Sequence, residues 1–160
     1  MTMFCMQHIR PAVRSDYSRV AEIYVFSNRL EYFPIFKNTD FSFNKLQVSS
    51  YEETLVQRKH EHIYVYDDGI IKGFMIVTGE EILKLHVDYF FQNQSIGSRL
   101  LDYSIRRCKA TYLWTLKKNQ RAIHFYGRHN MEITDMIRPV DESSEHSELL
   151  VKMVVKDDKK

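Results

Sequence analysis

The amino-acid sequence predicts an α/β (α+β) fold, in which about four helices flank a mixed, mostly antiparallel sheet of about seven strands. The first observation is size, because 160 residues with 44% apolar content suit one domain with a buried core, here residues 1–160. The second is that strand and helix patterns follow one another in the order β-α-α-β-β-β-α-β-α-β-β. The third is a strand–helix–strand unit in the second half, which predicts a parallel strand pair.

Two of the expected helices lie in the first third of the chain. Ser15 and Asp16 offer N-cap side chains, and apolar residues follow them at roughly helical spacing. Ser50 and Glu53 form an S-x-x-E capping-box pattern ahead of another apolar stretch. These patterns predict a strand over residues 6–12, a helix over 16–28 and a helix over 50–59.

The segment between these helices, residues 30–48, has no single interpretation. It is rich in aromatic residues, and Pro34 is its only strong helix breaker. An irregular aromatic segment of this kind either belongs to the core or lines a pocket.

The second half of the chain carries the clearest periodic patterns. The pair Asp68-Gly69 indicates a tight turn between two strands. From Gly97 onward, small and apolar residues recur at offsets 0, 3, 4, 7, 8 and 11 with charged residues opposite, which predicts an amphipathic helix. Asn119 is expected to cap the next helix and Asn130 to end it. The remaining patterns predict strands over 63–66, 70–78, 82–87, 112–115, 131–137 and 148–155.

The composition argues against several functional classes. A formal net charge of +2 with 28% charged residues is typical of a mixed surface, not of a nucleic-acid-binding protein. No apolar stretch resembles a signal peptide or a membrane span, so we expect a cytoplasmic protein that does not bind membranes. Cys5 and Cys108 lack a paired spacing and are expected to be reduced. His60 and His62 flank Glu61, but two histidines do not complete a metal site, so no metal is expected.

The junction between the strand at 82–87 and the helix near Gly97 is the candidate site. A strand followed by Gln92 to Gly97 and then a helix places backbone N–H groups at the positive end of a helix, where anions and phosphates bind. This signal alone is weak, because a single glycine before a helix is more often a packing device. The P-loop and the Rossmann glycine pattern are both absent.

Two sequence blocks carry a family resemblance. The run Leu83 to Leu101, LKLHVDYFFQNQSIGSRLL, resembles the acetyl-CoA signature [QR]-x-x-G-x-[GA] of the GNAT N-acetyltransferase superfamily. Gln92 and Gly97 match that signature, and Ser95 stands where the family usually has its first glycine. A second block resembles the family's strand followed by N-x-x-A-x-x-F-Y: Leu113-Trp114-Thr115, then Asn119, Ala122, Phe125 and Tyr126. The resemblance covers residues 9–155 and is specific over 83–126.

The resemblance implies acetyl-CoA as a co-substrate and no metal. In the family the pantetheine arm pairs like a strand with the central strand, and the pyrophosphate lies on the amides that open the helix. A non-glycine Ser95 at positive φ would cost about 1 kcal/mol and weaken binding without preventing it. The expected cofactor-binding residues are Leu85, His86, Val87, Gln92, Asn93, Gln94, Ser95, Ile96, Gly97, Ser98, Asn119 and Tyr126.

The implied reaction is direct attack of an amine on the thioester, which needs a proton acceptor and a donor for the leaving thiolate. By match to the family tyrosine, Tyr126 is the candidate donor, and the alternative is a core aromatic residue beside Phe125. Glu81 is a candidate base or a solvated strand-end carboxylate, and His86 is a second candidate base. Asn119 either only caps its helix or also touches the cofactor.

The sequence therefore predicts an acyltransferase that moves acetyl from acetyl-CoA to a primary amine of an unidentified small molecule or peptide. The alternative is a non-catalytic acetyl-CoA-binding sensor or interaction domain. The acceptor is expected between the aromatic stretch 24–51 and the loop at 138–147. Since dimers are common among similar proteins, a homodimer is left open.

Overall fold

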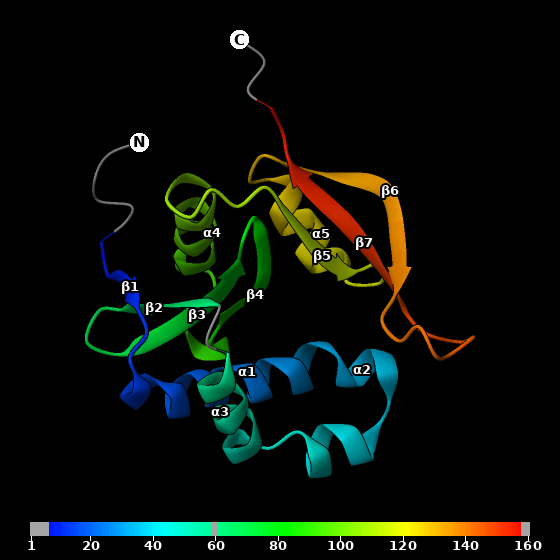
Figure 1. Cartoon of the computed structure of the whole chain (residues 1–160), viewed down its shortest axis with the longest axis horizontal. Coiled ribbons are helices and arrows are strands. Elements are labelled where there is room, and N and C mark those ends of the chain that lie inside the picture. Colours follow the sequence, from blue (N-terminus) through cyan, green and yellow to red (C-terminus); the bar gives the residue numbers. More distant parts are fainter. Residues whose placement is uncertain (1–6, 59–60, 158–160) are drawn as a thin grey trace.

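The computed structural model describes residues 7–58 and 61–157, which form one seven-stranded sheet with helices on both faces (Figure 1). The strands are β1 (Ile9–Pro11), β2 (His62–Asp67), β3 (Ile71–Thr78), β4 (Glu81–Val87), β5 (Tyr112–Leu116), β6 (Met131–Pro139) and β7 (Leu149–Val155). The helices are α1 (Tyr17–Glu31), α2 (Phe33–Phe36), α3 (Val48–Gln57), α4 (Ile96–Arg106) and α5 (Gln120–Gly127). Cys5 and His60 lie outside the described residues.

The sheet has the strand order β1-β2-β3-β4-β5-β7-β6. Every pair is antiparallel except β4 and β5, which are joined through α4 and run parallel. The predicted fold class is confirmed, with α2 as one short helix beyond the four expected.

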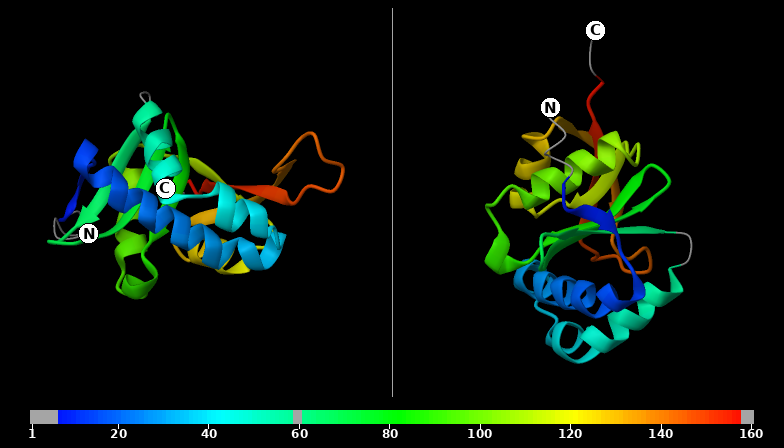
Figure 2. Two further views of the ribbon diagram at one scale, coloured as in Figure 1. Left: turned by 90° about the horizontal axis from the view of Figure 1, so that it is seen from below. Right: turned by 90° about the vertical axis from the view of Figure 1, so that its left-hand side faces the viewer.

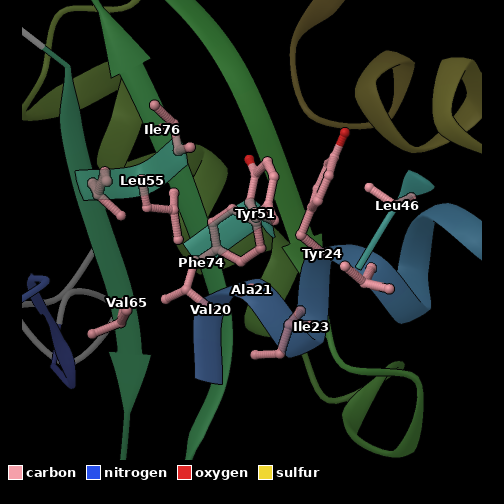
Figure 3. Packing of buried hydrophobic residues seen from close by; sticks show 12 residues of the cluster. Val20, Ala21, Ile23, Tyr24, Leu46, Tyr51, Leu55, Val65, Phe74 and Ile76 are labelled. Atoms are coloured by element: carbon pink, nitrogen blue, oxygen red, sulfur yellow. The ribbon is translucent and has the colours of Figure 1, made fainter. Parts of the chain in front are cut away.

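Two apolar layers hold the helices on the sheet. On one face, α1 and α3 pack on β2 and β3 around fully buried Phe74 (Figure 3). Tyr24 and Tyr51 stack there with ring centroids 3.9 Å apart. On the other face, α4 and α5 cover the sheet, as the end-on view in Figure 2 shows.

The aromatic segment after α1 divides into α2 and a π-helical turn over Asp40–Lys45. Lys37 ends α2 at a φ of 55°, a left-handed conformation that reverses the chain. Ile35 and Phe36 line a cavity described below, and so does Phe41. The segment therefore contributes to a pocket wall, one of the two roles that its composition suggested.

Three of the expected helix caps are wrong, because the side chains find other partners. Helix α1 has no side-chain cap from Ser15 or Asp16; the Asp16 carboxylate instead accepts hydrogen bonds from Arg10 and from the Val13 N–H. Helix α3 starts at Val48, so Ser50 lies in its first turn and bonds Gln47 rather than pairing with Glu53.

Helix α5 ends at Gly127, so Asn130 lies beyond its C-cap Arg128. Asn130 has a φ of 64° and turns the chain into β6. Asparagine adopts this left-handed conformation more readily than most residues, which explains its place in the turn.

Candidate active site

The central strand β4 has one paired edge and one largely open edge. It pairs with β3 from Glu81 to Val87, but with β5 only at Glu81 and Ile82. Beyond that point β4 and β5 diverge, as Figure 1 shows. Backbone N–H and C=O groups on this side of β4 have no strand partner, and such groups are strong binding sites for an extended chain.

A β-bulge lies where the two strands part. The register with β3 passes from Val77↔Ile82 to Ile76↔Lys84, which leaves Leu83 as the extra residue. A bulge bends a strand and increases its twist. The bulge at Leu83 therefore accounts for β4 turning away from β5 at this position.

The loop from β4 to α4 is held by side chains. The Asp88 carboxylate accepts from the Phe90 N–H at 2.9 Å, and it pairs with Arg19 of α1 at 2.8 Å. Gln92 accepts a hydrogen bond from Arg121 of α5 at 2.7 Å. These contacts tie the loop to two helices and fix the entrance of α4.

Backbone geometry at the start of α4 matches that of a glycine-containing anion loop. Ser95, the N-cap, has a φ of 63°, and Asn93 has a φ of 61°. The conformation considered for Ser95 from the sequence is thus present, without the glycine that usually favours it. The residues of the first turn of α4, whose N–H groups have no partner within the helix, line the cavity beside β4.

Gly97 serves close packing at this point. A Cβ there would lie 3.3 Å from Cζ of Phe125 and 3.6 Å from Cγ2 of Val87. A small side chain would need only a slight shift of the Phe125 ring, whereas a larger one would press against both neighbours. Gly97 therefore allows α4 to pack closely against β4 and α5.

Ser98 forms a hydrogen bond with His129 of 2.7 Å between Oγ and Nε2. The other ring nitrogen, Nδ1, lies 2.7 Å from the carbonyl oxygen of Phe125. Since a carbonyl only accepts, Nδ1 carries the proton, and Nε2 of the neutral ring accepts from the Ser98 hydroxyl. His129 was not singled out from the sequence, because the turn after α5 and the first turn of α4 meet only in the fold.

A single cavity of about 1670 Å³ brings the predicted residues together. It runs from the first turn of α4, along β4 and β5, to the end of α1 and the loop before β7. Of the predicted site residues, Gln94 alone does not line it; those that do are Glu81, Leu85, His86, Val87, Gln92, Asn93, Ser95, Ile96, Gly97, Ser98, Asn119 and Tyr126.

Tyr126 lies on α5 and faces this cavity beside Phe125. Burial raises the pKa of its hydroxyl well above the usual value, and the negative charge of Glu31 raises it further. The phenol therefore stays protonated and able to donate a hydrogen bond. Asn119 caps α5, its Oδ1 accepting from the Ala122 N–H at 3.2 Å.

The two candidate bases on β4 differ in environment. Burial and, to a smaller extent, the charge of Lys84 lower the pKa of His86 to about 3. No described residue hydrogen-bonds the buried His86 Nδ1, and the ring meets Tyr24 edge-on. A neutral ring with so low a pKa is a weak base. Glu81 lies where β4 and β5 still pair, and its carboxylate is 3.5 Å from the Tyr112 hydroxyl.

Glu31, at the end of α1, is a cavity residue that the sequence did not indicate. The residues with which it interacts electrostatically, Arg121 and Tyr126, lie on α5 about ninety positions later, so no local pattern could identify it. Burial raises the pKa of its carboxyl, and the charge of Arg121 partly opposes that shift.

Within residues 7–58 and 61–157, no three His, Cys, Asp or Glu side chains form a cluster that could hold a metal ion. Over the same residues, no helix is long and apolar enough to cross a membrane. Cys108 is a free thiol.

Comparisons with known proteins agree with the resemblance seen in the sequence. The chain has the fold of PaiA N-acetyltransferase from Thermoplasma acidophilum in complex with coenzyme A, with TM-score 0.64 and 16% identity over 90% of this chain and 96% of that one. YncA from Salmonella typhimurium, solved with acetyl-CoA, gives TM-score 0.63 and 16% identity over 95% and 94%. A spermidine N-acetyltransferase from Vibrio cholerae gives 0.62 and 15% over 92% and 93%.

At these identities, the solved structures establish the fold alone. No curated protein is significantly similar in sequence. The family model for the Acetyltransferase (GNAT) family matches residues 22–131, which include the second part of α1, the open strand β4, helix α4 and Tyr126. The chain therefore belongs to the GNAT acetyltransferase family.

Proposed function

We propose that the protein transfers an acetyl group from acetyl-CoA to a primary amine of a small molecule or peptide. The open edge of β4 carries this proposal, because it shares one cavity with the first turn of α4 and with Tyr126. Acetyl-CoA carries, in order, a diphosphate, an extended chain with amide groups and a reactive thioester. The first turn of α4, the open edge of β4 and Tyr126 offer groups that complement these three parts.

The residues present fit this substrate. The backbone at Leu85 and Val87 supports the proposed strand-like contact with the pantetheine amides, since this edge of β4 lacks a partner strand. The first turn of α4, opened by Ser95, offers N–H groups at its positive end to the diphosphate. Ser98 lies in the same turn, and its hydroxyl, which donates to His129 Nε2, ties this turn to the residues that follow α5.

The chemistry assigned to this chain is positioning and hydrogen bonding. A backbone N–H near Val87 is the proposed donor to the oxyanion that develops on the acetyl oxygen. Tyr126 is the proposed donor to the leaving sulfur, and its raised pKa keeps the proton available. Of the two candidate bases on β4, we retain Glu81. The low pKa of His86 argues against His86 as the base.

The test is release of coenzyme A thiol from acetyl-CoA in the presence of a panel of primary amines. We expect Tyr126→Phe to lower kcat by roughly 10–100-fold with little change in the affinity for coenzyme A. Tyr89→Phe is the control, because Tyr89 is 61% exposed and lies outside the cavity lining. Binding of coenzyme A without turnover of any amine would favour the non-catalytic alternative, and absence of binding would exclude both functions.

A further inference from the structure

We propose that Glu31 binds the ammonium group of the acceptor and accepts its proton, and that the acceptor is a primary amine with one positive charge and an apolar body. This inference rests on the proposed acetyltransferase function and adds a catalytic residue and a substrate class to it.

Glu31 stands apart from the other carboxylates of the cavity. Glu61 is paired with Arg58 at 2.5 Å, and Glu148 with Lys118 at 2.8 Å. Asp141 accepts from Ser143, and Glu81 lies 3.5 Å from the Tyr112 hydroxyl. No described residue donates a hydrogen bond to Glu31 or forms an ion pair with it within 4.0 Å, so its carboxylate is available to a ligand.

The position of Glu31 is energetically unfavourable for a negative charge. It is the last residue of α1, where the helix dipole is negative, and its carboxyl is partly buried. Burial raises its pKa, and the charge of Arg121 on α5 only partly opposes that shift, so its anion is a stronger base than an exposed glutamate. A cation bound from the cavity would relieve both effects, so the site is suited to an ammonium ion.

Aromatic side chains define the rest of the acceptor end. Tyr24, Tyr32, Phe36 and Phe41 line the cavity from α1 to the π-helical turn. Phe36 and Phe41 are 41% and 45% exposed, so large apolar surface is open to a ligand. Rings favour both the ammonium, through cation–π attraction, and an apolar substituent.

Charges in the same region disfavour a second positive group on the acceptor. The Lys84 ammonium lies 5.2 Å from the centroid of the Tyr24 ring, and the Arg138 guanidinium lies 4.3 Å from the Trp114 ring. Both side chains line the cavity. A diamine or polyamine would bring its second charge among these cations, whereas a monoamine needs only the Glu31 carboxylate.

The proton balance connects Glu31 to Tyr126. The ammonium gives one proton to the Glu31 carboxylate, and the freed nitrogen lone pair forms the C–N bond as the C–S bond breaks. Tyr126 donates its proton to the departing sulfur and regains one from the acylated nitrogen, and Glu31 releases its proton to solvent. Because the Glu31 charge raises the Tyr126 pKa, neutralising Glu31 makes Tyr126 a stronger donor when the sulfur leaves.

The experiment compares wild type, Glu31→Gln and Glu22→Gln with 2-phenylethylamine, hexylamine and spermidine as acceptors. Glu22 is the matched control, because it lies on α1, is 51% exposed and pairs with Arg19. We expect the wild type to use 2-phenylethylamine and hexylamine at least tenfold better than spermidine in kcat/KM. We expect Glu31→Gln to reduce kcat/KM by about 10²–10³ at pH 7, where only roughly one alkylamine molecule in 10³ is neutral.

The pH profile distinguishes proton transfer from a structural role. Above the Glu31 pKa, the wild-type kcat/KM should stay nearly flat up to the amine pKa. In Glu31→Gln it should rise about tenfold per pH unit toward that pKa and approach the wild type there, since the variant must capture neutral amine. Coenzyme A affinity should be equal in all three proteins.

A Glu31→Gln variant with wild-type rate and a flat profile would overturn the inference while leaving the proposed function intact. Spermidine used as well as 2-phenylethylamine would overturn the assigned substrate class in the same way. Failure of all three amines to be acetylated would overturn this inference, and only failure of the whole panel of primary amines would also overturn the proposed function.

Discussion

The two edges of β4 differ in how completely they are paired, and this difference locates the function. Toward β3 the pairing extends from Glu81 to Val87, and that half of the sheet holds the buried layer around Phe74. Toward β5 the pairing stops at Ile82, and the cavity begins there. One edge thus contributes stability and the other offers unpaired backbone to a ligand.

The largest change in stability should come from the fully paired side of β4, toward β3. Phe74 is fully buried, so Phe74→Ala should lower the free energy of unfolding by about 3–5 kcal/mol in urea titrations. The variant, where still folded, should bind coenzyme A within threefold of the wild type. Ile133→Ala, at a residue 53% exposed, is the control and should change stability by less than about 0.5 kcal/mol.

A smaller loss should follow from removing the ion pair that attaches β1 to the turn before α1. Arg10 contacts Asp16 at 2.7 Å and Asp67 at 2.8 Å, and Asp16 is buried. Asp16→Asn should cost about 1.5–3 kcal/mol of stability at pH 7 and leave coenzyme A binding unchanged.

This loss should depend on pH in a defined direction. The hydrogen bond from Arg10 holds the folded-state pKa of Asp16 below its ordinary value. The contribution of Asp16 is therefore fully present above its unfolded pKa of about 3.9 and disappears as the pH falls through the folded pKa. Wild type and Asp16→Asn should converge in stability in strong acid, and a constant difference down to pH 2 would contradict this assignment.

Coenzyme A binding at the open edge of β4 should weaken when the packing at Gly97 is changed. Gly97→Val places methyl groups against Phe125 and Val87, so we expect coenzyme A binding to weaken by roughly tenfold or more through displacement of α4. Gly127→Ala is the matched control, because a Cβ there meets no atom within 4 Å. Equal affinities for the two variants in calorimetry would show that Gly97 does not set the geometry of the site.

The smallest effect should come from Ser95. Its φ of 63° is strained for a serine, so Ser95→Gly should relieve up to about 1 kcal/mol in the folded protein. The greater freedom of glycine in the unfolded chain offsets part of this gain. We expect a rise in Tm of no more than a few degrees, and a fall of similar size would mean that the serine hydroxyl contributes more than its strain.

The sequence predicted the fold class and the residues at the cofactor end of the cavity because those features depend on local patterns. Helix α4 has a strong apolar periodicity, and the family motif around Gln92 and Gly97 is contiguous. Caps were less predictable: Asp16 has a partner in Arg10, which in turn bonds Asp67, 57 positions away from it. Such competition between distant side chains is not visible in a short window.

Sequence reasoning missed part of the site for the same reason, which is that it depends on contacts between distant residues. Glu31 ends a helix without any motif, and only the fold brings it close enough to Tyr126 and Arg121 of α5 for their charges to interact. The bulge at Leu83 likewise depends on the register with β3. Local patterns thus located the cofactor end of the cavity, and the fold was needed to locate the acceptor end.

Hydrogen–deuterium exchange with and without coenzyme A tests most directly whether the open edge of β4 binds the coenzyme. Backbone amides at 83–87 and in the first turn of α4 should become protected on binding, while those of β2 and β3 should change little. Saturating coenzyme A that leaves 83–87 unprotected, or protects the outer strand β6 instead, would contradict this account.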